Sequence, residues 1–304
     1  MNKLVKRLFL AIAFASMCAC SGDDTMLSSQ VENFSEVRFS FFDATMEEFG
    51  AGTRGDDSNT TSWKDTFKRL DIALIPVDKT KNDSVYRIHQ LAADKDFGKL
   101  SIRLPMGKYS LVAIASSSSN EVTISSAENV SFPDGVVTDM AYVYKELDVK
   151  SGSMSTNCLL SRAITKMVIV SNDYIPADIK KVELKYTGNI CTSFNPKTGY
   201  GIGATAANQI SKSFSISSNR VGKIATFALY AFLPQDSETI QVVLKTYDGD
   251  GKVVKALNFD NVVIQLKHIT TYTGPLFTAG NNFEFSFDNA ELTSGGNDKT
   301  FGDE

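Results

Sequence analysis

Short stretches in which apolar and polar residues alternate recur along the whole chain, and no stretch keeps the apolar spacing of a helix. Alternation puts apolar side chains on one face of a β-strand, whereas an amphipathic helix needs a period of about 3.6 residues. Clear examples are Leu100-Ser-Ile-Arg-Leu104 and Phe283-Glu-Phe-Ser-Phe287. We therefore expect an all-β protein whose helices are few and short.

Turn-forming residues separate these stretches at short intervals. Pro105-Met-Gly-Lys108 stands between two candidate strands and predicts a hairpin, as does Asp248-Gly-Asp-Gly251. A calcium loop starting at Asp248 would need a glutamate at its twelfth position, where the chain has Phe259. Many short strands joined by regular turns are typical of β-sandwiches.

The start of the chain has the pattern of an export signal. An apolar run, Leu8–Ala15, leads to the small residue Ala19 and then to Cys20. The run is too short to cross a membrane, which takes about 20 apolar residues. A cysteine directly after a small residue is typical of bacterial lipoprotein signals, so we expect cleavage between Ala19 and Cys20 and attachment of acyl chains such as palmitate to Cys20. The basic residues before the run are Lys3, Lys6 and Arg7.

The charge balance is mildly acidic. The chain has 31 basic and 35 acidic residues, a net charge of −4. Removal of the signal takes three basic residues and no acidic one, which leaves about −7. Such a surface argues against binding to nucleic acid and against electrostatic binding to anionic lipid.

The length suggests two domains. Lys150-Ser-Gly-Ser-Met-Ser-Thr-Asn157 is small and polar, and it is the best candidate boundary. We therefore expect a signal peptide over residues 1–19, a polar tether over 20–33, an N-terminal β-sandwich over 34–152 and a C-terminal β-sandwich over 153–304.

Besides the lipidated Cys20, two cysteines remain after the signal is removed, Cys158 and Cys191. If residues 159–171 and 179–190 pair as antiparallel neighbours, position 158 lies opposite position 191. A disulfide there is geometrically reasonable in an exported protein and is worth roughly 3–4 kcal/mol. Two buried thiols are the alternative, and strands on opposite sheets would weaken the prediction.

Nothing in the sequence indicates catalysis. The two histidines, His89 and His268, are far apart and have no neighbouring cysteine, so we expect no metal site. No Gly-x-Ser-x-Gly motif surrounds a serine, and no pair of carboxylates is singled out. We expect no catalytic residue, no cofactor and no enzyme.

Residues 44–66 are rich in Gly, Thr, Asp and Ser, which predicts an exposed loop. Arg54-Gly55 in this loop is a candidate cleavage site for a trypsin-like protease. Arg54-Gly-Asp56 also matches an integrin-binding tripeptide, but three residues often match by chance.

Several motifs resemble the fimbrial subunits of the Bacteroidales type, a family that includes fimbrillins and fimbrial anchor and tip lipoproteins. The resemblance covers most of the mature chain and is strongest after residue 155. Its motifs are Leu160-Ser-Arg-Ala-Ile-Thr-Lys-Met-Val-Ile-Val170 with Tyr174-Ile-Pro176, then Phe227-Ala-Leu-Tyr-Ala-Phe-Leu-Pro234 and His268-Ile-Thr-Thr-Tyr-Thr-Gly-Pro-Leu-Phe277. Ser21-Gly-Asp-Asp24 is similar to the acidic tag of surface-exposed lipoproteins in such outer membranes.

The resemblance implies two tandem transthyretin-like, Greek-key β-sandwiches and assembly into surface fimbriae by exchange of β-strands. In shaft subunits of that family an arginine-specific protease removes an N-terminal segment, and Arg54 is the nearest match here. The freed groove then accepts a donor strand from another subunit. Anchors and some tips keep their N-terminus, and the sequence leaves both alternatives open. Phe283, Phe285 and Phe287 would belong either to a closing strand of their own domain or to a donor strand.

Two functions follow as hypotheses. The first is a structural or accessory fimbrial subunit, lipid-anchored at the outer membrane, that binds other fimbrial subunits and supports adhesion to a host or bacterial surface. The second is a surface glycan-binding lipoprotein. It would need exposed aromatic platforms, for which the chain offers the single Trp63 and ten tyrosines.

Overall fold

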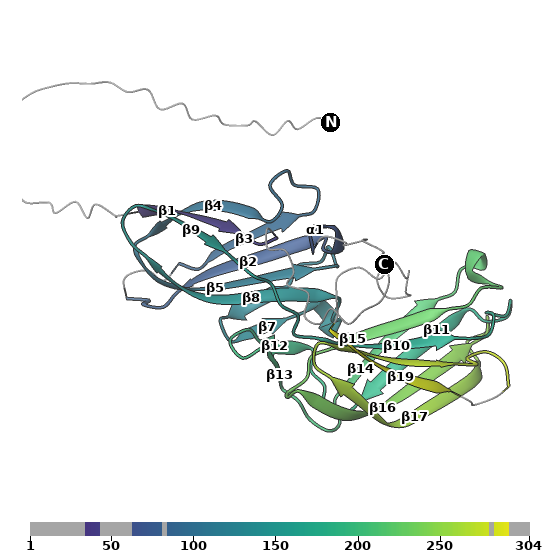
Figure 1. Ribbon diagram of the computed structural model, residues 1–304. Coiled ribbons are helices and arrows are strands. Elements are labelled where there is room, and N and C mark those ends of the chain that lie inside the picture. The colour runs from purple at the N-terminus through teal and green to yellow at the C-terminus, as the bar shows by residue number, and fades with distance from the viewer. Residues whose placement is uncertain (1–33, 43–62, 81–83, 280–282, 292–304) are drawn as a thin grey trace, which may run out of the picture. The chain divides into compact units, whose positions relative to one another are not determined.

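The structure is a computed structural model that describes residues 34–42, 63–80, 84–279 and 283–291, all within one compact unit. Nearly every element is a strand (Figure 1), which confirms the all-β prediction. The helical elements are α1 (Trp63–Thr66), η1 (Pro133–Gly135) and η2 (Ser218–Arg220). The strands are β1 (Phe34–Ser40), β2 (Arg69–Pro76), β3 (Tyr86–Leu91), β4 (Lys99–Pro105), β5 (Gly107–Ser116), β6 (Thr123–Ser126), β7 (Asn129–Ser131), β8 (Met140–Val149), β9 (Ser153–Asn157), β10 (Thr165–Ser171), β11 (Lys181–Thr187), β12 (Ser193–Asn195), β13 (Tyr200–Ile202), β14 (Gln209–Ser215), β15 (Thr226–Ala231), β16 (Ser237–Tyr247), β17 (Val253–Gln265), β18 (His268–Gly274) and β19 (Glu284–Glu291).

Two sheets of the first half enclose the first core. One has the order β4-β1-β9 and the other the order β3-β2-β5-β8. The first core takes side chains from both sheets, which is the arrangement of a β-sandwich. Its residues are Val37, Phe39, Phe41, Phe67, Leu70, Ile72, Leu74, Phe97, Leu104, Tyr109, Leu111, Ala113, Ala115, Ala141, Val143, Leu147, Val149 and Cys158.

Two further sheets, β15-β10-β18-β19 and β14-β11-β16-β17, enclose the second core. Strand β11 shows how the sequence builds it, because Val182, Leu184 and Tyr186 alternate with half-buried polar residues and point inward. The hydroxyl of Tyr186 lies 3.3 Å from the carbonyl oxygen of Met167, so this buried tyrosine has a hydrogen-bond partner. The second core is centred on Met167, Ile169, Val182, Leu184, Tyr186, Phe214, Phe227, Leu229, Val242, Leu244, Val262 and Ile264.

A short fifth sheet, β13-β12-β7-β6, joins strands from the two halves of the chain. Its antiparallel β7–β12 pair sets Val130 opposite Phe194. Phe194 stacks on Phe232 with ring centroids 4.7 Å apart. At Gly201 an added Cβ would lie 2.8 Å from the sulfur of Cys191, so only glycine fits there. Polar contacts add to the junction, since Arg162 donates from Nε and Nη2 to Asp139 at 2.9 and 2.7 Å.

One sequence expectation about connections is wrong. The turn at Pro105 does not close a hairpin, because β4 pairs with β1 while β5 pairs with β2 and β8 in the other sheet. The candidate boundary segment contains β9, which pairs with β1. If β9 and β1 belong to the same domain, the boundary lies after Asn157 rather than between residues 152 and 153. The division into two domains stays a prediction.

No helix among the residues that the structure describes is long and apolar enough to cross a membrane.

Candidate functional site

Strand β1 occupies the middle of its sheet although it is the first described element of the chain. It pairs antiparallel with β4, with Val37 opposite Ile102, and parallel with β9, with Val37 opposite Met154. The strands on either side therefore depend on β1 for their hydrogen-bonded edges. Removal of β1 would leave two facing edges and an open slot between them.

One face of β1 belongs to the first core. Val37 and Phe39 of β1 and Phe41 just after it are buried, with exposed fractions of 0, 3 and 2%. Their spacing of two and their β-branched or aromatic side chains explain why this stretch forms a strand. Full burial of each side chain is worth roughly 1.5–3 kcal/mol, so an empty slot would be strongly apolar and would need a replacement strand.

The other face of β1 is polar. Arg38 donates from Nε and Nη2 to Glu36 at 3.1 and 3.0 Å, and the hydroxyl of Ser101 on β4 donates to Glu36 at 2.8 Å. The hydrogen bonds from Ser101 and Arg38 lower the pKa of Glu36. These contacts are exposed to solvent. They pair the polar side chains on the outer face of β1, but they contribute little to the stability of the fold.

Four of the expected site residues lie outside the described residues. They are Ala19 and Cys20 at the predicted signal cleavage and lipidation site, and Arg54 and Gly55 at the predicted protease site. Strand β1 ends at Ser40, and the described residues stop at Phe42 and resume at Trp63. Arg54 therefore lies in the segment that connects β1 to the remainder of the protein.

The C-terminal phenylalanines lie at a sheet edge. Strand β19 pairs antiparallel with β18, with Phe285 opposite Tyr272 and Phe287 opposite Thr270. Phe283 precedes the strand and its ring lies edge-on to Phe259 at 4.9 Å. Strand β19 is therefore the edge strand of the sheet β15-β10-β18-β19 of its own chain.

The residues just before β19 are held by a carboxylate. Asp173 accepts hydrogen bonds from the backbone N–H groups of Leu276, Phe277 and Thr278 at 2.7–2.9 Å. Burial opposes ionisation of Asp173, but these bonds outweigh it and lower its pKa. The ammonium group of Lys255 donates to the carbonyl oxygen of Thr278 at 2.6 Å. Residues 276–278, at the start of the connection to β19, are thus held in place by these hydrogen bonds.

The disulfide between Cys158 and Cys191 is not formed, and both are buried free thiols. The pairing on which it depended is wrong, because β10 belongs to the sheet β15-β10-β18-β19 and β11 to the sheet β14-β11-β16-β17. Cys158 packs in the first core, whereas Cys191 packs at the junction beside Phe232.

Both thiols are expected to resist alkylation in the folded protein. Burial raises the pKa of each to about 11, so at pH 8 only about a thousandth of either is the reactive thiolate. Iodoacetamide followed by peptide mapping checks this, with the urea-unfolded protein as control. Both sites should be alkylated after unfolding, and rapid labelling of either in the native protein would contradict the burial.

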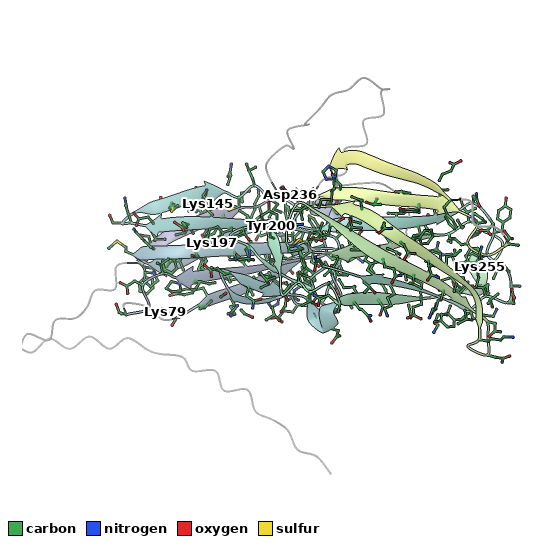
Figure 2. All side chains as sticks on the ribbon, turned by 90° about the horizontal axis from the view of Figure 1, so that it is seen from below. Lys79, Lys145, Lys197, Tyr200, Asp236 and Lys255 are labelled. Carbon is green, nitrogen blue, oxygen red and sulfur yellow. The ribbon has the colours of Figure 1, made fainter. Side chains whose placement is uncertain are left out.

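Two clefts outside β1 were not foreseen from the sequence. One is lined by residues of β13, the start of β16 and the β17–β18 turn, and includes Tyr200 and Asp236, which lie side by side (Figure 2). Their segments are far apart in sequence and carry no motif, so no sequence signal could have joined them. In the described parts of the chain, no three His, Cys, Asp or Glu residues are grouped so as to hold a metal ion.

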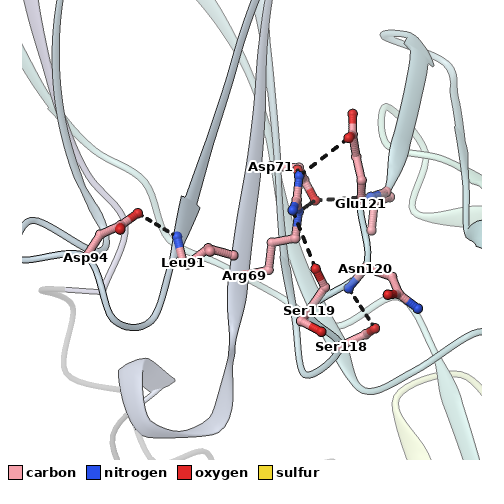
Figure 3. A network of polar contacts seen from close by, with 9 residues as sticks. Arg69, Asp71, Leu91, Asp94, Ser118, Ser119, Asn120 and Glu121 are labelled. Carbon is pink, nitrogen blue, oxygen red and sulfur yellow. Dashed lines mark hydrogen bonds and ion pairs between the residues drawn. The ribbon is translucent and has the colours of Figure 1, made fainter. Parts of the chain in front are cut away.

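The second cleft lies beside a buried ion pair (Figure 3). Arg69 and Asp71, exposed by 8 and 5%, share β2, and Nε of Arg69 is 2.9 Å from both carboxylate oxygens. Asp71 also accepts from the N–H of Val122 at 3.2 Å, and Arg69 donates to the carbonyl oxygen of Ser119 at 3.4 Å. Burial raises the pKa of Asp71, against the hydrogen bonds from Val122 and Arg69 that lower it.

Several solved structures from Bacteroidales contain chains similar to this one. One is described as "a putative adhesin" from Bacteroides ovatus, with 12% identity, a TM-score of 0.47 and coverage of 81% of this chain and 88% of that chain. A second is named "putative polysaccharide binding proteins" from Bacteroides thetaiotaomicron, with 10% identity, a TM-score of 0.44 and coverage of 83% and 96%. A third is the fimbrial anchor protein Mfa2 from Porphyromonas gingivalis, with 11% identity, a TM-score of 0.40 and coverage of 86% and 99%.

None of the curated proteins matches the chain. One family model does, over residues 122–292, which is more than half of the 304 residues. The match includes all four strands of the fifth sheet, β13-β12-β7-β6. It also includes all strands of the two sheets that enclose the second core. The protein therefore belongs to the family described as "Family of unknown function (DUF6562)".

Proposed function

We propose that the protein is a structural or accessory subunit of cell-surface fimbriae that assembles by exchange of β-strands and supports adhesion. The observation that carries the proposal is the place of β1, a central strand that covers the first core and is joined to the rest of the chain through the segment containing Arg54. The sequence motifs that resemble fimbrial subunits support the same function.

Cleavage at Arg54 would change how β1 is held. In the intact chain β1 is tethered, so its effective concentration at the slot is high and no free strand competes well. After a cut, β1 is held only by hydrogen bonds and by the burial of Val37, Phe39 and Phe41. A strand from another subunit with the same alternation can then replace it, which is strand addition in the middle of a sheet.

Export precedes this step in the proposed pathway. The signal before Cys20 would deliver the protein to the outer membrane, where acyl chains on Cys20 anchor it on the surface. If Arg54 is cut, the anchor leaves with β1, and the subunit polymerises. If Arg54 is retained, the same fold serves as an anchored accessory subunit. The partners are other fimbrial subunits in both cases.

Deletion of the gene tests the proposal in cells. We expect fimbriae that are absent, or changed in number or length, and we expect fimbrial subunits to co-purify with the tagged protein from the surface of the complemented strain. Electron microscopy of negatively stained cells provides the readout. Fimbriae identical to those of the parent, with no fimbrial subunit co-purified, would contradict the proposal.

A further inference from the structure

The cleft near Tyr200 has a volume of about 400 Å³, which falls in the range of small-molecule sites, roughly 300–1,000 Å³. Four segments build it: β8 with Tyr142, the turn that leads into β13, the start of β16, and the turn between β17 and β18. Its polar side chains are those of Tyr142, Thr198, Tyr200, Asp236, Ser237, Gln265, Lys267 and His268.

Tyr200 and Asp236 lie at the centre of the cleft, and a hydrogen bond between them holds both side chains in place without a ligand. The hydroxyl of Tyr200 donates to Oδ1 of Asp236 at 2.8 Å, and Figure 2 shows the two side chains together. The backbone carbonyl of Asp236 accepts from the N–H of Leu266 at 2.8 Å, which ties the β16 side of the cleft to the β17–β18 turn. The hydrogen bond to Asp236 raises the pKa of Tyr200, so the phenol keeps its proton.

The remaining wall supplies further hydroxyl and nitrogen groups. Nδ1 of His268 lies 2.7 Å from the carbonyl oxygen of Leu266, which can only accept, so Nδ1 donates this hydrogen bond and the bond orients the ring. Gly199 has φ +79° and an added Cβ would lie 2.6 Å from the hydroxyl oxygen of Tyr142, so this glycine lets Tyr142 reach the cleft.

These groups fit one class of ligand better than others. Lys267 and Asp236 carry opposite charges, which leaves no excess positive charge for a phosphate and no excess negative charge for a polycation. The only large aliphatic side chain in the lining is Leu266, which is too little apolar surface for a lipid chain. Closely spaced donors and acceptors beside a half-exposed aromatic ring suit sugar hydroxyls and the apolar face of a pyranose ring.

We propose that this cleft binds a short neutral saccharide, with Asp236, Gln265 and His268 bonding sugar hydroxyls and Tyr200 contacting the ring face. The site would give the protein a ligand of its own, beyond its role as a structural subunit. It lies on strands other than β1, so saccharide binding and strand exchange can fail independently.

The test uses the full chain without its signal and a panel of free sugars. The probes are glucose, galactose, mannose, N-acetylglucosamine, their disaccharides and, as a charged member, glucuronic acid. Saturation-transfer NMR followed by calorimetry should detect at least one neutral member with a Kd in the millimolar range or tighter. Tyr200→Ala, Asp236→Ala and Gln265→Ala should each weaken that binding about tenfold or more. Tyr200→Ala loses the contact with the sugar ring, and the other two variants each lose a hydrogen bond to a sugar hydroxyl.

Tyr247→Ala is the matched control, since Tyr247 also donates its hydroxyl to a carboxylate, that of Glu183, but does not line the cleft. It should bind the sugar as the wild type does. Thermal unfolding of each variant separates loss of binding from loss of fold, and Gln265→Ala replaces Asp236→Ala if the latter unfolds. Binding of no neutral sugar, binding of glucuronic acid alone, or equal binding by Tyr200→Ala and Gln265→Ala would overturn the proposal.

Discussion

Treatment with an arginine-specific protease is expected to convert the wild-type protein from monomers into oligomers, whereas Arg54→Ala should remain monomeric. The cut separates β1 from the rest of the chain, and the slot between β4 and β9 becomes available to a strand of a second molecule. Light scattering after size-exclusion chromatography measures the oligomers, and mass spectrometry should find a new N-terminus at Gly55. The effect is all-or-none, because a tethered β1 excludes competing strands.

A second arginine provides the control for this experiment. Arg220 lies in η2, outside the strands, so Arg220→Ala removes a turn arginine without touching the β1 connection. This variant should form oligomers as the wild type does. Oligomers from Arg54→Ala, or a wild-type protein that is cut at Arg54 and stays monomeric at every concentration, would contradict strand exchange.

Arg69→Met is expected to destabilise the fold by about 3–5 kcal/mol. The substitution leaves the carboxylate of Asp71 buried, with the N–H of Val122 as its remaining hydrogen-bond donor among those described above (Figure 3). An uncompensated buried charge costs far more than the ion pair itself contributes. Urea unfolding followed by circular dichroism measures the change in the free energy of unfolding.

The double variant Arg69→Met/Asp71→Leu provides the control, since it removes both charges and should recover most of the loss. The pH dependence has a definite sign. Burial already raises the pKa of Asp71, and loss of Arg69 removes one group that lowers it. The folded-state pKa then exceeds the unfolded-state pKa, so the deficit of Arg69→Met is full at neutral pH and shrinks as the pH falls toward about 4. A deficit that grows on acidification would mean that Asp71 is not the source.

Local features of the fold could be predicted from the sequence, because they depend on neighbouring residues. The turn at Asp248 is an example: its carboxylate accepts from the N–H groups of Asp250 and Lys252, Gly251 has φ +77°, and β16 and β17 pair on either side. Alternation likewise identified the inward residues of β4, where Leu100, Ile102 and Leu104 are more buried than the residues between them.

Pairing between strands could not be predicted in the same way. The turn at Pro105 and the segment 172–180 both read as hairpin connections, yet each carries the chain from one sheet to the other. Alternation shows which face of a strand is buried but not which strand lies beside it, because both sheets of a sandwich have the same pattern. The disulfide between Cys158 and Cys191 was expected for that reason.

The candidate sites show the same limit. The sequence pointed to the connection around Arg54, but the central place of β1 depends on its parallel pairing with β9, over a hundred residues later. That strand is Ser153–Asn157, whose serines, threonine and asparagine are typical of a linker. The cleft at Tyr200 and Asp236 exists only where four distant segments meet.

Native mass spectrometry of strand replacement tests the central claim most directly. The protein is cut at Arg54 and incubated with a synthetic peptide of residues 34–42 that carries an isotope label. We expect one-to-one replacement of the protein's own N-terminal fragment by the labelled peptide, with the body of the protein still folded. A fragment that never exchanges, or a body that unfolds when the fragment leaves and does not recover with the peptide, would contradict the claim that β1 is a replaceable strand.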